Sequence, residues 1–222
     1  MLPKLSALQA AIVDLDGTMV DTVGDFEVAL ALALADVGRP PVSRDFILRT
    51  IGKGSEHLIA QTLAEVGAPA SLFDATWAAY QRHYLAVNGQ HAAVYPGVVE
   101  GLQALRDAGL KLACLTNKPG SFARPLLALK GLDHFFEHTF GGDAFERKKP
   151  DPLPLLKTCE ALGVAPARAL MVGDSVNDVL AARAAGCPVV LVGYGYNHGA
   201  SAASAMPDAV VDRLDRLVGS VR

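Results

Sequence analysis

Short apolar runs alternate with segments of helical periodicity along most of this 222-residue chain, and this alternation limits its possible folds more than any other feature. The apolar runs have the length and composition of strands that are buried on both faces. They lie at residues 10–15, 110–115, 169–172 and 189–192. The helical patterns between them lie at residues 97–108, 121–129, 153–162 and 178–185. Because helices of this length form right-handed crossovers between parallel strands, the sequence predicts an α/β fold with a doubly wound parallel sheet.

The region just after the first apolar run breaks the alternation, because it contains helical patterns and no convincing strand. These patterns cover residues 25–37, 56–66 and 71–84, and turn-forming Gly and Pro residues separate them. A block of helices at this place predicts a small helical domain inserted into the α/β core. We therefore expect a helical domain at residues 19–91 and a core formed by residues 1–18 and 92–222.

The composition argues against several kinds of partner and location. The 20 Lys and Arg residues are balanced by 23 Asp and Glu residues without a basic cluster, so neither nucleic acid nor a membrane is expected as a partner. The 3 cysteines are scattered, which is typical of free thiols in a reducing compartment. Asp14 ends the N-terminal apolar stretch too early for an export signal, and the run at residues 28–35 is too short to span a membrane. We expect a cytoplasmic protein, either a monomer or a homodimer.

Polar side chains follow three of the predicted strands. Asp14 and Asp16 come after the first strand, Thr116, Asn117 and Lys118 after the second, and Asp174 and Ser175 after the third. Because ligands of open parallel sheets bind beyond the carboxyl ends of the strands, we expect these side chains to form one site. Carboxylates, a hydroxyl and an amide at one edge are suited to phosphoryl transfer, which depends on positioning and on charge neutralisation.

The two neighbouring carboxylates suggest both a metal and a mechanism. Asp14 and Asp16 could not both approach a phosphate dianion unaided, and oxygen ligands favour Mg²⁺ over zinc. Asp14 is the candidate nucleophile, which would form an aspartyl-phosphate. Asp16 would protonate the leaving oxygen and later deprotonate the hydrolytic water.

These motifs resemble those of the haloacid dehalogenase superfamily of phosphohydrolases and, within it, the bacterial phosphoglycolate phosphatases. The segment DLDGT at residues 14–18 is similar to the first motif of that family, and Thr116 with Asn117 to the second. Lys149 is similar to the third motif, and GDSVND at residues 173–178 to the fourth. The resemblance covers essentially the whole chain, and it implies a Rossmann-like core with an inserted helical cap.

The resemblance also implies a role for each motif. Thr116 and Asn117 would hold the phosphoryl group, and Lys149 would steady the nucleophile and the phosphate. Asp174 would bind Mg²⁺ together with a carboxylate oxygen of Asp14 and the backbone carbonyl of Asp16. Asp178 would act through the lysine or through a metal-bound water. Two alternatives stay open: Lys148 instead of Lys149 could be the lysine that points inward, and Asp178 could complete a capping box with Ser175.

The carboxylate at Asp16 favours a phosphatase or a phosphomutase, because family members that break carbon–halogen bonds or pump ions do not usually carry Asp there. The segments GKG at residues 52–54 and GYGYN at residues 193–197 are similar to phosphoglycolate phosphatases. Lys53 departs from that pattern, in which Asn is usual, and its cation could reach the carboxylate of a two-carbon substrate or another anion. The resemblance thus implies hydrolysis of 2-phosphoglycolate. The alternatives are a phosphatase for another small metabolite such as a sugar phosphate, a phosphomutase and a non-catalytic phosphate-binding protein.

Overall fold

The strands of the main sheet run parallel in the order β5-β4-β1-β6-β7-β8 in the computed structural model, which describes residues 4–220. Their bounds are β1 Ala10–Val13, β4 Lys111–Leu115, β5 His138–Phe140, β6 Ala169–Gly173, β7 Val189–Val192 and β8 Ala209–Val211. The predicted parallel sheet is confirmed. The edge strands β5 and β8 were not predicted, because each has 3 residues and neither is an uninterrupted buried apolar run.

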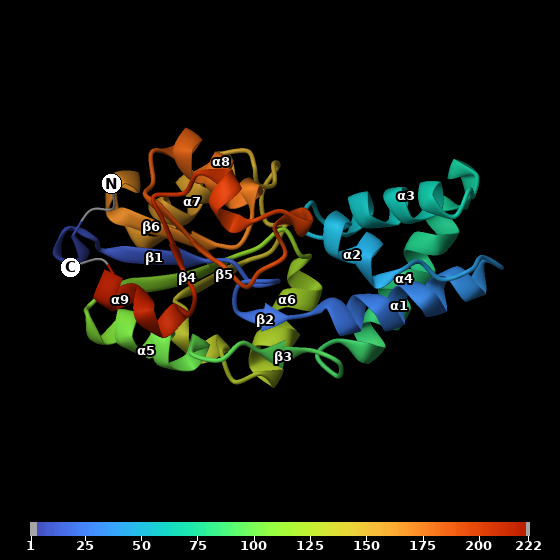
Figure 1. Cartoon of the computed structure of the whole chain (residues 1–222), viewed down its shortest axis with the longest axis horizontal. Coiled ribbons are helices and arrows are strands. Elements are labelled where there is room, and N and C mark those ends of the chain that lie inside the picture. The colour runs from blue at the N-terminus through green and yellow to red at the C-terminus, as the bar shows by residue number, and fades with distance from the viewer. Residues whose placement is uncertain (1–3, 221–222) are drawn as a thin grey trace.

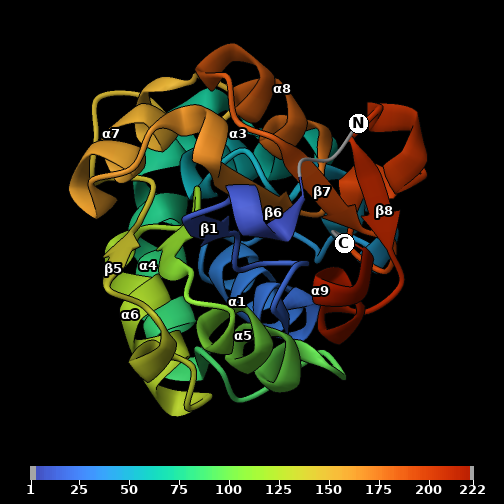
Figure 2. The same cartoon turned by 90° about the vertical axis from the view of Figure 1, so that its left-hand side faces the viewer.

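Helices cover both faces of this sheet, as a doubly wound fold requires (Figure 2). Helices α5 (Val98–Asp107), α6 (Gly120–Leu129) and α9 (Leu217–Ser220) lie on one face, and α7 (Leu153–Leu162) and α8 (Val176–Ala185) lie on the other. Successive strand residues alternate between the two hydrophobic cores. In β1, for example, Ala11 and Val13 pack on the α5 side, while Ala10 and Ile12 pack on the α7 side.

The remaining helices form a separate layer beside the sheet, which we call the helical unit (Figure 1). It consists of α1 (Val23–Asp36), α2 (Arg44–Thr50), α3 (Ser55–Glu65) and α4 (Phe73–Val87). Its own hydrophobic core includes Phe26, Ile59, Tyr80 and Tyr84, and Phe122 of α6 packs against that core. Helix α2 was not predicted, because its 7 residues give too short a periodic pattern. We call the rest of the described chain the sheet unit.

A short ribbon joins the two units. The chain leaves the sheet unit along β2 (Val20–Asp21) and returns along β3 (Ala93–Val94), and these strands pair antiparallel. The buried carboxylate of Asp25 strengthens the junction, since it accepts hydrogen bonds from the backbone N–H groups of Gly89 at 2.7 Å and His91 at 2.8 Å. The ribbon lies at the borders of the predicted helical domain. Residues 1–3 and 221–222 of the predicted core lie outside the described residues.

Short 3₁₀ helices occupy several of the connections. They are η1 Leu5–Ala7, η2 Ala70–Leu72, η3 Asp133–Phe135, η4 Pro166–Arg168, η5 Asn197–Gly199, η6 Ala202–Ala205 and η7 Leu214–Arg216. Within residues 4–220, none of the helices combines the length and the apolar character that a membrane crossing needs.

Candidate active site

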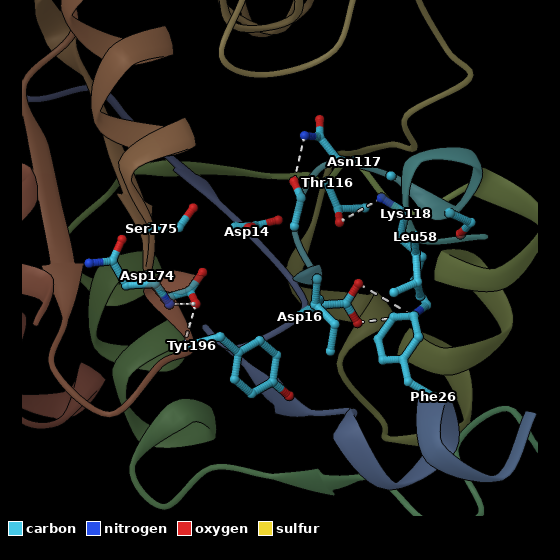
Figure 3. Close-up of a pocket in the computed structure, with 15 residues that line it drawn as sticks. Asp14, Asp16, Phe26, Leu58, Thr116, Asn117, Lys118, Asp174, Ser175 and Tyr196 are labelled. Atoms are coloured by element: carbon cyan, nitrogen blue, oxygen red, sulfur yellow. Dashed lines mark hydrogen bonds and ion pairs between the residues drawn. The ribbon is translucent and has the colours of Figure 1, made fainter. Parts of the chain in front are cut away.

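Five of the predicted site residues meet at the carboxyl edge of β1, β4 and β6, namely Asp14, Asp16, Thr116, Asn117 and Asp174 (Figure 3). Strand β1 pairs with β4 on one side and with β6 on the other, so the chain connections on its two sides run in opposite directions across the sheet. Open α/β sheets bind ligands at such a point. A small cavity of about 30 Å³ lies at this edge. The sheet unit lines it with Asp14, Asp16, Thr116, Asn117, Lys118 and Asp174, and the helical unit with Phe26, Ile51, Gly52, Gly54, Ser55 and Leu58. The cavity therefore lies between the two units.

The turn after β1 presents Asp14 at the end of its strand. The backbone N–H of Asp14 donates to the carbonyl of Val172 at 2.9 Å and so continues the pairing of β1 with β6. A glycine is needed in this turn, because Gly17 has a φ of +78° and a Cβ there would lie 2.4 Å from Oδ2 of Asp174. The glycine thus lets the first and fourth motifs approach each other.

Lys149 is buried beside Asp14. Its ammonium lies 3.1 Å from Oδ1 of Asp14 and 2.7 Å from Oδ1 of Asp178, and it donates to the carbonyl of Leu115 at 3.0 Å. Burial alone would lower the pKa of Lys149, but the charges of Asp14 and Asp178 outweigh this effect and raise it. The neighbouring Lys148 is partly exposed and pairs with Glu56 of the helical unit. Of the two adjacent lysines, Lys149 is the one that points inward.

Three buried carboxylates form a cluster that could hold a metal ion. Oxygen atoms of Asp14, Asp174 and Asp178 all lie within 4.8 Å of one another. Burial raises the pKa of Asp14 to about 7 against the attraction of Lys149, and the charge of Asp178 adds to the rise. Burial and the same neighbouring charge hold the pKa of Asp174 well above its usual range. A divalent cation bound by these hard oxygen donors would relieve that repulsion, so the residues present fit Mg²⁺.

Asp178 contacts both the start of helix α8 and the side chain of Lys149. Its Oδ2 accepts hydrogen bonds from the backbone N–H of Ser175 at 3.1 Å and from the Ser175 hydroxyl at 3.0 Å, which completes the capping box of α8. Its Oδ1 is the oxygen that faces Lys149. The helix cap therefore fixes the carboxylate that orients the lysine.

Thr116 and Asn117 both line the cavity, but their contacts differ. Thr116 Oγ1 accepts a hydrogen bond from the backbone N–H of Lys118 at 3.2 Å. The amide of Asn117 accepts from the backbone N–H of Lys149 at 3.0 Å and donates to the carbonyl of the same residue at 2.8 Å. It also donates to the carbonyl of Gly52 in the helical unit at 2.9 Å. In this arrangement Asn117 positions the third motif and contacts the helical unit.

Lys53 lies apart from these residues. Its side chain is exposed, and the described residues that line the cavity do not include it, although Gly52 and Gly54 on either side do belong to the lining. The role predicted for Lys53 stays a prediction.

Several contributing residues were not singled out from the sequence. The backbone N–H of Tyr196 donates to Oδ2 of Asp174 at 2.7 Å, and the Tyr196 hydroxyl donates to Asp21 at 2.8 Å at the entry to the helical unit. Asn177 donates to the carbonyl of Gly52 at 3.1 Å. Lys118 is buried against Asp16. The segment 193–197 and the polar residues after β4 are the only signals in the sequence that point toward Tyr196 and Lys118.

The fold and the site define a hydrolase of the haloacid dehalogenase-like family. The family model matches residues 8–186, and the chain belongs to this family. More particularly, it is a phosphatase that resembles the phosphoglycolate phosphatases. It is 45% identical over 210 residues to the phosphoglycolate phosphatase of Thiobacillus denitrificans, which covers 93% of this chain and 92% of the relative. It is also 45% identical to a plasmid-encoded phosphoglycolate phosphatase of Cupriavidus necator, over 94% of this chain and 90% of the relative.

A solved structure supports the same family assignment. The crystal structure of a predicted phosphoglycolate phosphatase from Haemophilus somnus superposes with a TM-score of 0.91 at 32% identity. The superposition covers 97% of this chain and 99% of the other. The similarity thus extends over both the sheet unit and the helical unit.

Proposed function

We propose that this protein is a Mg²⁺-dependent phosphatase that hydrolyses 2-phosphoglycolate to glycolate and phosphate through an aspartyl-phosphate. The observation that carries the proposal is the position of Asp14, whose carboxylate lies 3.1 Å from the ammonium of Lys149 and within 4.8 Å of a carboxylate oxygen of Asp174. A carboxylate in this position has a cation beside it and a metal-binding carboxylate nearby. The cation, and a metal ion once bound, would offset the charge of an incoming phosphate.

The reaction needs two displacements. In the first, an oxygen of Asp14 attacks phosphorus, the ester P–O bond breaks, and Asp16 gives its proton to the leaving oxygen. In the second, Asp16 removes a proton from water, the water attacks phosphorus, and inorganic phosphate leaves as the Asp14 carboxylate is restored. Lys149 holds Asp14 and neutralises phosphate charge throughout, while Thr116 and Asn117 border the phosphoryl position.

Asp14, Asp174 and the backbone carbonyl of Asp16 would hold Mg²⁺, which when bound supplies charge neutralisation around the phosphate. Asp178 would act indirectly, through its contacts with Lys149 and the start of α8. These assignments are supported by the oxygen-only donor set of the cluster.

The helical unit is proposed to act as a cap. Residues 19–91 would form the cap domain over a core of residues 1–18 and 92–222, and closure would exclude water from the phosphate site. The bonds from Asn117 and Asn177 to the carbonyl of Gly52 support this proposal, because they join the two units at Gly52, which lines the cavity. We further propose a cytoplasmic monomer or homodimer that acts on a small phosphorylated metabolite and binds neither nucleic acid nor membrane.

The names of the relatives support 2-phosphoglycolate as the substrate. Both relatives at 45% identity are phosphoglycolate phosphatases. A phosphatase for another small metabolite is the alternative, and the exposed Lys53 could then bind a different anion.

Phosphate release from purified protein tests the proposal. The assay compares 2-phosphoglycolate, a hexose phosphate and an aryl phosphate, each with Mg²⁺ and with a chelator. We expect turnover of 2-phosphoglycolate to exceed that of the hexose phosphate and to stop on chelation, and Asp14→Asn to be inactive. Activity that survives full chelation contradicts the metal assignment. Phosphate that stays on the organic product would indicate a mutase, and a protein inactive toward all three esters would be a binding protein.

A further inference from the structure

Lys118 is a buried cation in the wall of the cavity. Among the described residues that line the cavity it is the sole cation, and its side chain is only 1% exposed. The ammonium lies 4.6 Å from the ring centroids of Phe26 in α1 and Tyr84 in α4 (Figure 3 shows Phe26). Lysine is rarely buried without a specific partner, so this placement requires an explanation.

The charged partner of Lys118 is the candidate acid–base residue. Its ammonium donates to Oδ1 of Asp16 at 2.9 Å and to Oδ2 at 3.3 Å, and it also donates to the hydroxyl of Tyr84 at 2.6 Å. The hydroxyl of Thr22 also donates to Oδ1 of Asp16, at 2.7 Å. An ammonium group has three donors, and here they are directed to the two carboxylate oxygens of Asp16 and to the hydroxyl of Tyr84. The contact with Oδ2 of Asp16 is the longest of the three, so a donor becomes available to a ligand when Asp16 turns away.

The position of Lys118 relative to the ester oxygen follows from its contact with Asp16. In the proposed reaction Asp16 contacts the leaving oxygen of the ester. The ammonium of Lys118, beside Asp16, is then close to the substituent on the carbon that is bonded to this oxygen. In 2-phosphoglycolate that same carbon carries the carboxylate. When Asp16 turns toward the ester oxygen, Lys118 loses part of its ionic contact, and a buried ammonium without an anion is costly. A substrate carboxylate at this place would offset the loss.

We propose that Lys118 determines specificity by binding the carboxylate of the leaving group, so that the site selects phosphate esters with an anionic group next to the ester carbon. This inference rests on the proposed phosphatase function. The surroundings of Lys118 fit a short carboxylate better than a sugar, because Phe26, Ile51 and Leu58 give the helical unit an apolar lining with few partners for hydroxyl groups. Lys53, the other candidate cation, is exposed and outside this lining.

Two esters that differ only in the anionic group test the proposal. Ethyl phosphate replaces the carboxylate of 2-phosphoglycolate with a methyl group. The quantity measured is kcat/KM for 2-phosphoglycolate divided by kcat/KM for ethyl phosphate. We expect Lys118→Met to lower this ratio by roughly ten- to a hundredfold, the contribution of one hydrogen bond between charged groups. Lys118→Arg should restore part of it. The matched control is Lys157→Met, which removes an exposed lysine of α7 and should leave the ratio unchanged.

The possible outcomes separate this proposal from the proposed function. If Lys118→Met lowers kcat/KM for both esters equally, Lys118 does not bind the substrate carboxylate. The same conclusion follows if Lys53→Met lowers the ratio and Lys118→Met does not. The wild-type protein gives a test that does not depend on the folding of any variant. Equal hydrolysis of both esters by the wild type overturns this proposal alone, whereas hydrolysis of neither overturns the proposed function as well.

Discussion

The ammonium of Lys149 lies 3.1 Å from Oδ1 of Asp14, although the two residues come from different crossover units of the sheet. Both side chains are buried, so neither charge is screened by water. The contact therefore fixes the carboxylate and sets its charge at the same time. Removing either partner has consequences for stability and for chemistry.

Replacing Lys149 with Met should leave Asp14 and Asp178 buried without their cation. Breaking a buried ion pair from one side costs about 3–5 kcal/mol, so we expect the free energy of unfolding to fall by that amount. Phosphatase activity should fall at least about a hundredfold, because one preorganised charge is lost. Denaturant unfolding and phosphate release measure the two effects. Lys148→Met, which removes a partly exposed lysine, is the control, and equal effects of the two substitutions would contradict the assignment.

Proton and metal should compete for the carboxylate cluster. The folded-state pKa of Asp14 is raised from 3.8 to about 7, so without metal its contribution to stability is greatest below pH 3.8 and is lost as the pH rises through 7. Asp174 changes in the same direction. The melting temperature without metal should therefore fall from about pH 5 to about pH 8, and the increase produced by Mg²⁺ should grow over that range.

Thermal unfolding with Mg²⁺ and with a chelator at several pH values checks this expectation. Asp174→Asn should abolish most of the Mg²⁺-dependent increase, because it removes one of the clustered oxygen donors. An increase of the same size at every pH would show that Asp14 does not exchange a proton for the metal.

Gly17→Ala should be far more harmful than a glycine substitution without neighbours. Gly17 has a φ of +78°, and a Cβ there would lie 2.4 Å from Oδ2 of Asp174. Gly109 has a φ of +82° with nothing within 4 Å, so Gly109→Ala measures the backbone strain alone, about 1–2 kcal/mol. We expect Gly17→Ala to cost more than this and to abolish Mg²⁺ binding by displacing Asp174. Denaturant unfolding and metal titration of the two variants give the comparison.

Asn177→Ala should weaken the contact between the two units above the cavity. It removes the 3.1 Å hydrogen bond to the carbonyl of Gly52, which leaves Asn117 as the remaining amide donor to that oxygen among the described residues. One neutral hydrogen bond corresponds to a loss of about three- to tenfold in kcat/KM. Glu56→Ala, which removes the exposed ion pair with Lys148, should cost about twofold or less. Steady-state kinetics of both variants give the two losses in kcat/KM. A larger loss for Glu56→Ala than for Asn177→Ala would contradict this expectation.

Central strands and motif positions could be predicted because they depend on local sequence. Strands β1, β4, β6 and β7 are apolar runs that are buried on both faces, and the polar residues after the first three identify the carboxyl edge of the sheet. The edge strands β5 and β8 and the short helix α2 lack such a signal. Each has too few residues for its periodicity to stand out from the surrounding loop.

Other parts of the candidate site depend on how the helical unit packs against the sheet unit, which no local pattern encodes. Lys118 follows Asn117 in sequence, and a lysine after a strand is usually solvated. Here the rings of Phe26 and Tyr84 from the helical unit lie 4.6 Å from its ammonium. The orientation of Lys53 depends on the same packing. Sequence therefore indicates the reacting groups better than it indicates the groups that surround the rest of the substrate.

The β2–β3 ribbon has a consequence for how such enzymes can diversify. Because Val20 pairs with Val94, the segment between them begins and ends at adjacent points, and its replacement would leave the strand register of the sheet unchanged. Loop-closure entropy grows only slowly with the length of an insert, so segments of different size can occupy this place at a similar cost. The helical segment is in this sense an exchangeable module. Evolution or a protein engineer can replace the part of the cavity wall that Phe26, Ile51 and Leu58 form, while Asp14, Thr116 and Asp174 keep their places at the edge of the sheet.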